Sequence, residues 1–207
     1  MRLHIGVAPG GGKDHHQAAI VFVEHRQVAS ALPDGRVTMD HMVIHVERQA
    51  PILEVLRDRI LVLARRTRPD KACFFVDAAG GLGTGLVKIL TDMRRDNVFP
   101  QDMHKPEAYT RRGVARQGLV NAIVEQYGSG RLKFATGLPL QAQLIRALET
   151  YESQVADDGK VSFSGDEEMV IALGLALGYY RHGAPPRYIQ RDGKTIAASR
   201  LLSTDPY

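Results

Sequence analysis

The chain of 207 residues contains one cysteine and no tryptophan. Cys73 has no partner for an internal disulfide, which excludes a disulfide-stabilised fold and any zinc site built from several cysteines. No run approaches the roughly 18 apolar residues that a membrane-spanning helix requires. The first residues, MRLHIGVAPG, also lack the apolar core of a secretory signal. We therefore expect a cytoplasmic protein with no membrane partner.

What is present is typical of an ordinary globular domain. Hydrophobic residues make up 44% of the chain and charged residues 24%, which argues against disorder. The length predicts one domain, which we place at residues 1–182, followed by a C-terminal tail at 183–207. The 27 Lys and Arg residues exceed the 23 Asp and Glu residues by four. This mild excess permits a polyanionic partner without requiring one.

Short apolar segments alternate with segments of helical periodicity. Leu3–Val7, Ala18–Glu24 and Thr38–Val46 have strand character and lie close together, which predicts an antiparallel meander. Ala72–Asp77 is a nearly continuous apolar run, typical of a buried parallel strand. The order predicts an α/β fold: a mixed sheet whose first three strands are antiparallel, then parallel strands, flanked by helices.

The remaining elements are predicted from the same periodicities. A loop at 78–85 leads into a helix that ends near residue 95. The other expected helices lie at 52–66, 114–127, 138–153 and 167–181, and the weaker strands at 98–103, 131–134 and 160–163.

Two glycine-rich loops follow predicted strands, but neither has the spacing of a nucleotide site. Around Gly12-Lys13, Val7 replaces the first glycine of a P-loop and Asp14 replaces its hydroxyl residue. In the second loop, Leu86 stands where a dinucleotide fingerprint has its third glycine. We expect no nucleotide cofactor.

Carboxylates stand where two predicted elements meet loops. Asp77 ends a buried strand, and Asp166-Glu167-Glu168 precede a very apolar helix. Asp77 could simply cap a helix or face solvent, and the three acids are favoured at a helix start by the helix dipole alone. A helix this apolar must be buried, however, so its acidic start would point into a cleft. Carboxylates converging there would suit Mg²⁺ or Mn²⁺.

In this order, the segments resemble the nuclease domain of the large terminase subunit of tailed bacteriophages. The resemblance runs from about Leu3 to Leu177 through LHIGVAPGGGKDHHQAAIVFVE, CFFVDAAGGLGTGLVKIL, GRLKF and DGKVSFSGDEEMVIALGLAL. It implies an RNase H-like fold, related to retroviral integrases and Holliday-junction resolvases. The family pattern has a first strand ending in Asp-Pro-Gly, a second Asp ending the central strand, and an acidic pair before the last helix.

Carried over by position, the resemblance implies a metal site. Asp77 matches the central metal-binding Asp, and Glu167 and Glu168 match the acidic pair, with Asp166 beside them. Ala8 stands where the first metal-binding Asp is expected, and Asp14 could replace that Asp in part. The implied chemistry is phosphodiester hydrolysis by two Mg²⁺ or Mn²⁺ ions. Ala8 cannot ligate a metal, so the chain is either an enzyme inactivated by an Asp→Ala substitution or a naturally degenerate one.

The resemblance further implies cleavage of concatemeric double-stranded DNA during viral genome packaging, with an ATPase motor domain, a small terminase subunit and a portal as partners. Two alternatives stay open: a catalytically inactive DNA-binding or docking module of the same fold, and a resolvase- or transposase-like nuclease. The basic residues between 105 and 133 are candidate phosphate contacts, although they would equally suit a solvated face. They are Lys105, Arg111, Arg112, Arg116, Arg131 and Lys133.

Overall fold

The computed structural model describes residues 2–10, 17–29, 37–66, 72–93, 98–101, 116–155, 161–181, 188–191 and 194–197. Asp14, Lys105, Arg111 and Arg112 lie outside these residues. Within the described part of the chain, no helix has the length and hydrophobicity to cross a bilayer.

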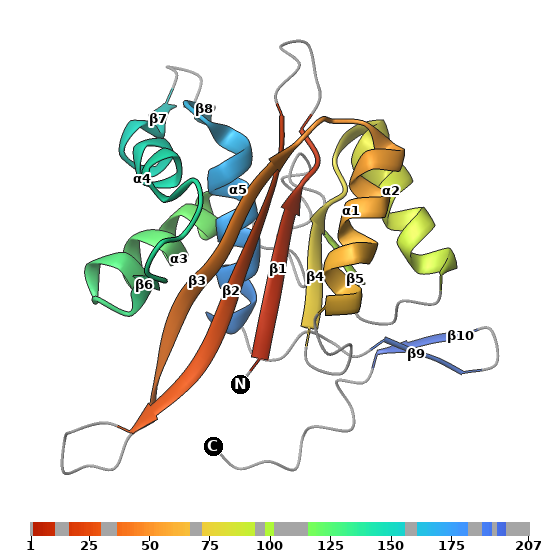
Figure 1. Ribbon diagram of the computed structural model, residues 1–207, viewed down its shortest axis with the longest axis horizontal. Helices are drawn as coiled ribbons and strands as arrows, with labels where there is room; N and C mark the ends of the chain where they lie inside the picture. Colours follow the sequence, from red (N-terminus) through yellow and green to blue (C-terminus); the bar gives the residue numbers. More distant parts are fainter. Residues whose placement is uncertain are drawn as a thin grey trace.

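A six-stranded sheet forms the centre of the molecule, in the order β5-β4-β1-β2-β3-β6 (Figure 1). The first three strands pair antiparallel, and each of the other three is parallel to its neighbour. This is the mixed sheet that the sequence predicts. The strands are β1 (Arg2–Ala8), β2 (Ala18–Ala29), β3 (Val37–Gln49), β4 (Ala72–Asp77), β5 (Val98–Gln101) and β6 (Leu132–Phe134).

Helices cover both faces of the sheet (Figure 1). One face carries α1 (Leu53–Arg66) and α2 (Gly80–Asp92). The other carries α3 (Arg116–Gly128), α4 (Gln141–Thr150) and α5 (Glu167–Arg181). Two small sheets complete the description: β7 (Glu152–Val155) with β8 (Val161–Ser164), and β9 (Tyr188–Arg191) with β10 (Lys194–Ala197).

Two hydrophobic cores follow from the alternation of side chains along the strands. Val7, Ile20 and Phe74 pack with α1 and α2. Their neighbours on the same strands, such as Val21 and Phe75, pack with α3, α4 and α5. Because both faces are covered, β4 is apolar along nearly its whole length, as expected of a buried parallel strand.

The structure departs from the predicted elements in several places. Helix α2 begins at Gly80, so most of the expected loop at 78–85 is helical. Helix α4 begins only at Gln141, after Leu140, whose φ of 58° lies in the left-handed region and interrupts a helix. The region after residue 183, predicted as a C-terminal tail, contains the β9–β10 hairpin. The domain boundary at 182 stays a prediction.

A bulge in the β2–β3 pair sends two nearby histidines to opposite faces. The register shifts between Phe22 and Val23, so that His41 pairs with His25 whereas His45 pairs with Phe22. The Nδ1 atoms of His25 and His41 lie 2.7 Å apart. The ring centroid of His4 lies 4.1 Å from that of His25, which makes a buried row of histidines beneath α5. Strand β3 therefore carries a buried or partly buried histidine on each of its covered faces, His41 on one and His45 on the other.

Candidate functional site

Asp77 is the last residue of β4 and is only 8% exposed. Its Oδ1 accepts a hydrogen bond of 2.9 Å from the backbone N–H of Ala79, which fixes the carboxylate before α2 begins. Gly83 packs directly against it, because a Cβ atom at Gly83 would lie 2.2 Å from the carbonyl oxygen of Asp77. The sequence prediction of a rigidly held carboxylate at a strand end agrees with this geometry.

Ala8 ends the neighbouring strand at the same level. Val7 pairs with Val76 in the parallel β1–β4 register, and Ala8 and Asp77 are the next residues of the two strands. Ala8 is 2% exposed and belongs to the core on the α5 side. Since side chains alternate along strands, Asp77 points to the same face as Phe75, which is also the α5 face.

The packing of α5 on β1 brings its acidic end to Ala8. The Nδ1 of His4 lies 3.1 Å from the carbonyl oxygen of Ala176, and Gly6 touches the carbonyl of Ala172. From His4 to Gly6 the strand advances about 6.6 Å, and from Ala176 to Ala172 the helix advances about 6 Å. The strand and the helix therefore keep nearly the same spacing along this contact. Extrapolated by one further step, this pairing puts Glu168 at the level of Ala8. Ala8, Asp77 and the start of α5 therefore lie at the same end of the sheet (Figure 1).

Arg48 completes this end of the sheet and was not a candidate from the sequence. It pairs with Ala19 across β2 and β3, and Ala19 pairs with Ala8 across β1 and β2. Its guanidinium forms an ion pair with the carboxylate of Asp166, and its side chain is 18% exposed. Burial lowers the pKa of Arg48, and the nearby charge of Glu168 opposes this shift. Arginine remains a cation throughout.

The acidic end of α5 is partly buried. Asp166 Oδ1, Glu167 Oε1 and Glu168 Oε2 are side-chain oxygens with almost no solvent contact. Asp166 Oδ1 accepts no hydrogen bond from the described residues, while the carboxylate faces Arg48. The N-terminal end of the helix dipole also favours negative charge at these positions.

We tested whether these residues fit the pair of divalent ions that the resemblance implies. The donor type is right, because carboxylate oxygens are the ligands that Mg²⁺ and Mn²⁺ prefer. The donor number is too small: within the described part of the chain, no three His, Cys, Asp or Glu side chains form a group able to hold a metal. Ala8 occupies a third position in the arrangement and has no ligand atom. The described residues therefore do not fit a two-ion site.

The candidate DNA contacts are only partly described. Arg116 is the first residue of α3, and its side chain lies outside the description, as do Lys105, Arg111 and Arg112 entirely. Lys133 of β6 pairs with Met42 of β3 and makes an ion pair with Asp40. Arg131 directly precedes β6.

Arg131 and Lys133 lie far from the carboxylates at the start of α5, Asp166, Glu167 and Glu168, which we call the acidic cluster. Arg48 is six residues beyond Met42 on β3, a distance of about 20 Å along an extended strand. The structure does not bring Arg131 and Lys133 to the end of the sheet where Asp77 and Glu168 lie.

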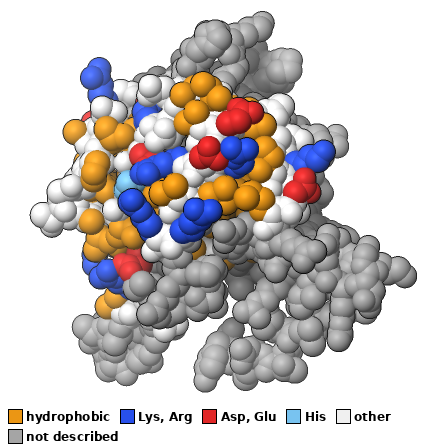
Figure 2. Space-filling model, turned by 45° about the vertical axis from the view of Figure 1, so that its right-hand side comes forward, with side chains coloured by type: hydrophobic (Ala, Val, Ile, Leu, Met, Phe, Trp, Pro, Cys, Tyr) orange, Lys and Arg blue, Asp and Glu red, His pale blue; other side chains and the backbone are white. Residues whose placement is uncertain are grey.

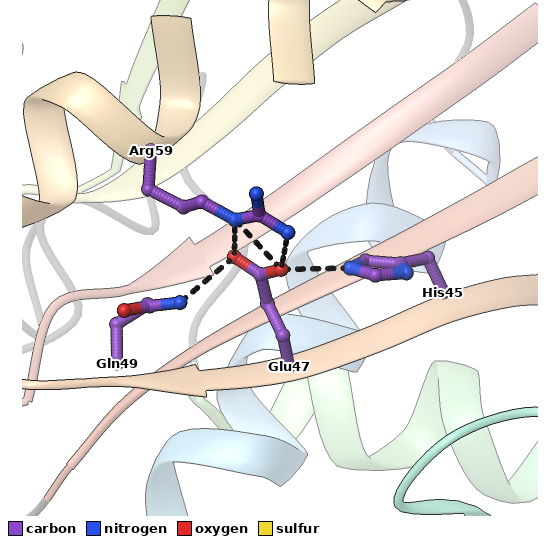
Figure 3. A network of polar contacts seen from close by, with 4 residues as sticks. All are labelled: His45, Glu47, Gln49 and Arg59. Atoms are coloured by element: carbon purple, nitrogen blue, oxygen red, sulfur yellow. Dashed lines mark hydrogen bonds and ion pairs between the residues drawn. The ribbon is translucent and has the colours of Figure 1, made fainter. Parts of the chain in front are cut away.

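A second polar cluster lies on the opposite face of β3 (Figure 3). The Nε–H of Arg59, on α1, donates to both oxygens of the Glu47 carboxylate, at 2.8 and 2.9 Å. His45 Nε2 lies 2.8 Å from Glu47 Oε2, and Gln49 donates a longer hydrogen bond to Oε1. Burial alone would raise the pKa of Glu47, but the hydrogen bonds and charges of His45 and Arg59 lower it to about 2. The cluster ties α1 to the sheet and leaves its own charges paired.

The helix face in front of β4 does not offer a surface of one charge. Figure 2 shows basic, acidic and hydrophobic side chains intermingled on the face that is turned forward. Arg65 and Arg66 are exposed at the C-terminal end of α1, where the helix dipole stabilises cations in any case.

Sequence comparisons find no matching protein-family model and no similar curated protein. Structure comparisons do find relatives of the fold. The large terminase nuclease of thermophilic phage G20c, with bound magnesium, has a TM-score of 0.59 and 14% identity, and the match covers 85% of this chain and 80% of that one. The same nuclease with bound cobalt matches equally well. The large terminase nuclease domain of Thermus phage P74-26 has a TM-score of 0.55 and 14% identity, over 84% of this chain and 77% of that one.

These likenesses establish the fold. The chain has the RNase H-like mixed α/β fold of large terminase nuclease domains, as the sequence resemblance implied. At 14% identity, the chemistry of the site has to be argued from its own residues.

Proposed function

We propose that this chain is a terminase-type nuclease domain whose metal site is disabled at Ala8 and can be restored by one carboxylate. The observation that carries the proposal is the position of Ala8, which ends β1 in register with Asp77, the last residue of β4. In the family pattern this position holds an Asp. The likeness to nucleases with bound magnesium and cobalt supports a site for a divalent ion in an intact version of the fold.

The substrate that we propose is double-stranded DNA, cut as a concatemer during packaging of a viral genome. A fold-level likeness does not by itself assign a function, so the proposal depends on Asp77 and the acidic start of α5 lying at the same end of the sheet. In the present chain, Asp77 and Glu168 supply two of the three carboxylates that such a site needs. We infer that the chain binds DNA and hydrolyses it poorly. An ATPase motor, a small subunit and a portal would be its partners in the complete packaging machine.

The test is a comparison of Ala8→Asp with the unsubstituted chain. Each protein is incubated with linear double-stranded DNA and Mn²⁺, and the cleavage rate is measured by gel. We expect Ala8→Asp to cleave at least about a hundredfold faster, since metal-assisted hydrolysis requires the complete ligand set. Ala8→Asn is the matched control, because it has the same size and no charge. The double variant Ala8→Asp with Asp77→Asn should again be inactive.

Other outcomes separate the alternatives. If folded Ala8→Asp binds DNA but cleaves no faster than Ala8→Asn, the nuclease proposal is wrong and a binding module of the same fold remains. If Ala8→Asp cleaves branched DNA in preference to linear duplexes, a resolvase-like activity replaces the packaging role.

A further inference from the structure

Arg48 is a cation at the acidic start of α5, at the end of the sheet where Ala8 and Asp77 lie. It contacts Asp166, at the acidic start of α5, from the end of β3. In the sheet, Arg48 lies in register with Ala19 and, through it, with Ala8. The guanidinium forms its ion pair with Asp166, and Glu168 is its second acidic neighbour.

The burial of the group makes this contact energetically important. The Arg48 side chain is 18% exposed and that of Asp166 is 33% exposed, so neither charge is fully hydrated. Carboxylates gathered in a partly buried site repel one another, and a cation has to balance them. In a metal-dependent nuclease the ions supply that balance. Here a positive charge is already present at the acidic cluster.

We propose that Arg48 is the resident counter-cation of the acidic cluster and takes over the electrostatic role of a divalent ion at Asp166 and Glu168. This inference rests on the proposed function for the view that the cluster corresponds to a metal site. It adds that two features, Ala8 and Arg48, act in the same direction: the first removes a ligand and the second opposes any approaching cation. Arg48 is thus a positioning residue for the carboxylates.

A purely structural ion pair is the main alternative explanation. The Arg59–Glu47 pair, on the other face of the same strand, is such a pair and provides an internal comparison. It joins a partly buried arginine to a buried carboxylate on the α1 side of the sheet, away from the start of α5. Removing either arginine should lower stability, but only the loss of Arg48 should change how the protein binds metal.

The experiment measures Mn²⁺ binding without DNA, from the loss of the free-ion signal in electron paramagnetic resonance. We expect Arg48→Gln to bind Mn²⁺ at least about tenfold tighter than the unsubstituted chain, because a unit charge a few ångströms away no longer opposes the ion. Arg48→Lys keeps the charge and should bind as weakly as the unsubstituted chain. Mn²⁺ should also raise the melting temperature of Arg48→Gln and leave that of Arg59→Gln unchanged.

A second pair of variants serves if Arg48→Gln fails to fold. The pair consists of Asp166→Asn and the double variant Asp166→Asn with Arg48→Gln. Only the first keeps the arginine, and in neither is a charged Asp166 left without its ion-pair partner. The double variant should bind Mn²⁺ more tightly than the single one.

The inference is wrong if Arg48→Gln binds Mn²⁺ no more tightly than the unsubstituted chain, or if Arg59→Gln tightens binding equally. Neither result depends on DNA cleavage. A failure here therefore leaves the test with Ala8→Asp standing, and the reverse also holds.

Discussion

A Cβ atom placed on Gly6 would lie 1.8 Å from the carbonyl oxygen of Ala172. Helix α5 and strand β1 are therefore in contact through their backbones, with no side chain between them. This contact fixes the height of α5 above the sheet and, with it, the position of the acidic start of α5. The geometry of the candidate site depends on a glycine two residues away.

We expect Gly6→Ala to lower the free energy of unfolding by about 3 kcal/mol, because overpacking against backbone cannot be relieved by a rotamer change. Urea unfolding followed by circular dichroism measures the change. Gly81→Ala is the control, since nothing lies within 4 Å of a Cβ atom there. Its helical position should make it neutral or stabilising by up to about 1 kcal/mol. Equal effects of the two variants would contradict the close contact.

Gly83 has the same role for Asp77. In the Ala8→Asp background, we expect Gly83→Ala to lower the cleavage rate about a hundredfold, because small displacements of a reacting group have effects of this size. Single-turnover cleavage at saturating Mn²⁺ measures it. Gly81→Ala in the same background should keep the full rate. A Gly83→Ala variant with an unchanged rate would show that Asp77 does not need this contact.

Glu47 should make folding sensitive to acid. The pKa of its carboxyl lies at about 2 in the folded chain, against 4.5 as the ordinary value. A depressed pKa stabilises the folded state above the ordinary pKa, and this contribution is lost as the pH falls from about 4.5 to about 2. Urea unfolding of the unsubstituted chain and Glu47→Gln should differ by about 2–3 kcal/mol at pH 7. The difference should shrink below pH 4.5; a constant difference would contradict the assignment.

The basic residues expected to contact DNA make a prediction in solution. Replacing Arg111, Arg112 and Arg116 together by Gln should weaken DNA binding and reduce the slope of log affinity against log salt by about 3, one for each lost phosphate contact. Fluorescence anisotropy with a labelled duplex measures this. Arg65→Gln with Arg66→Gln is the matched control and should leave the slope unchanged. Unchanged binding by the triple variant would reject the 105–133 surface.

Much of the fold could be predicted because its elements carry local patterns. Ala72–Asp77 is apolar throughout and ends in an acid, and the structure has a strand with these same bounds. The α5 helix was also predicted with its observed bounds, because an acidic start and a long apolar run define both its ends. Local periodicity was enough for these two elements, and together they carry Asp77, Glu167 and Glu168.

Arg48 could not be predicted, for a physical reason. The apolar alternation of β3 stops at Val46, so the sequence predicts a strand that ends there. The strand continues to Gln49 because Ala18 and Ala19 of β2 pair with its last residues. Pairing between distant segments is not encoded in the local pattern. The contact of Arg48 with Asp166 depends on that pairing and on the position of α5.

The close approach of His25 Nδ1 to His41 Nδ1 has a consequence for their protons. Two nitrogens 2.7 Å apart require one hydrogen between them, so one ring donates from Nδ1 and the other accepts. Burial lowers the pKa of His41, which favours the neutral form of that ring. The tautomer of the ring on β2 therefore determines that of the ring on β3. Nitrogen-15 chemical shifts of the imidazole rings would reveal which strand carries the hydrogen.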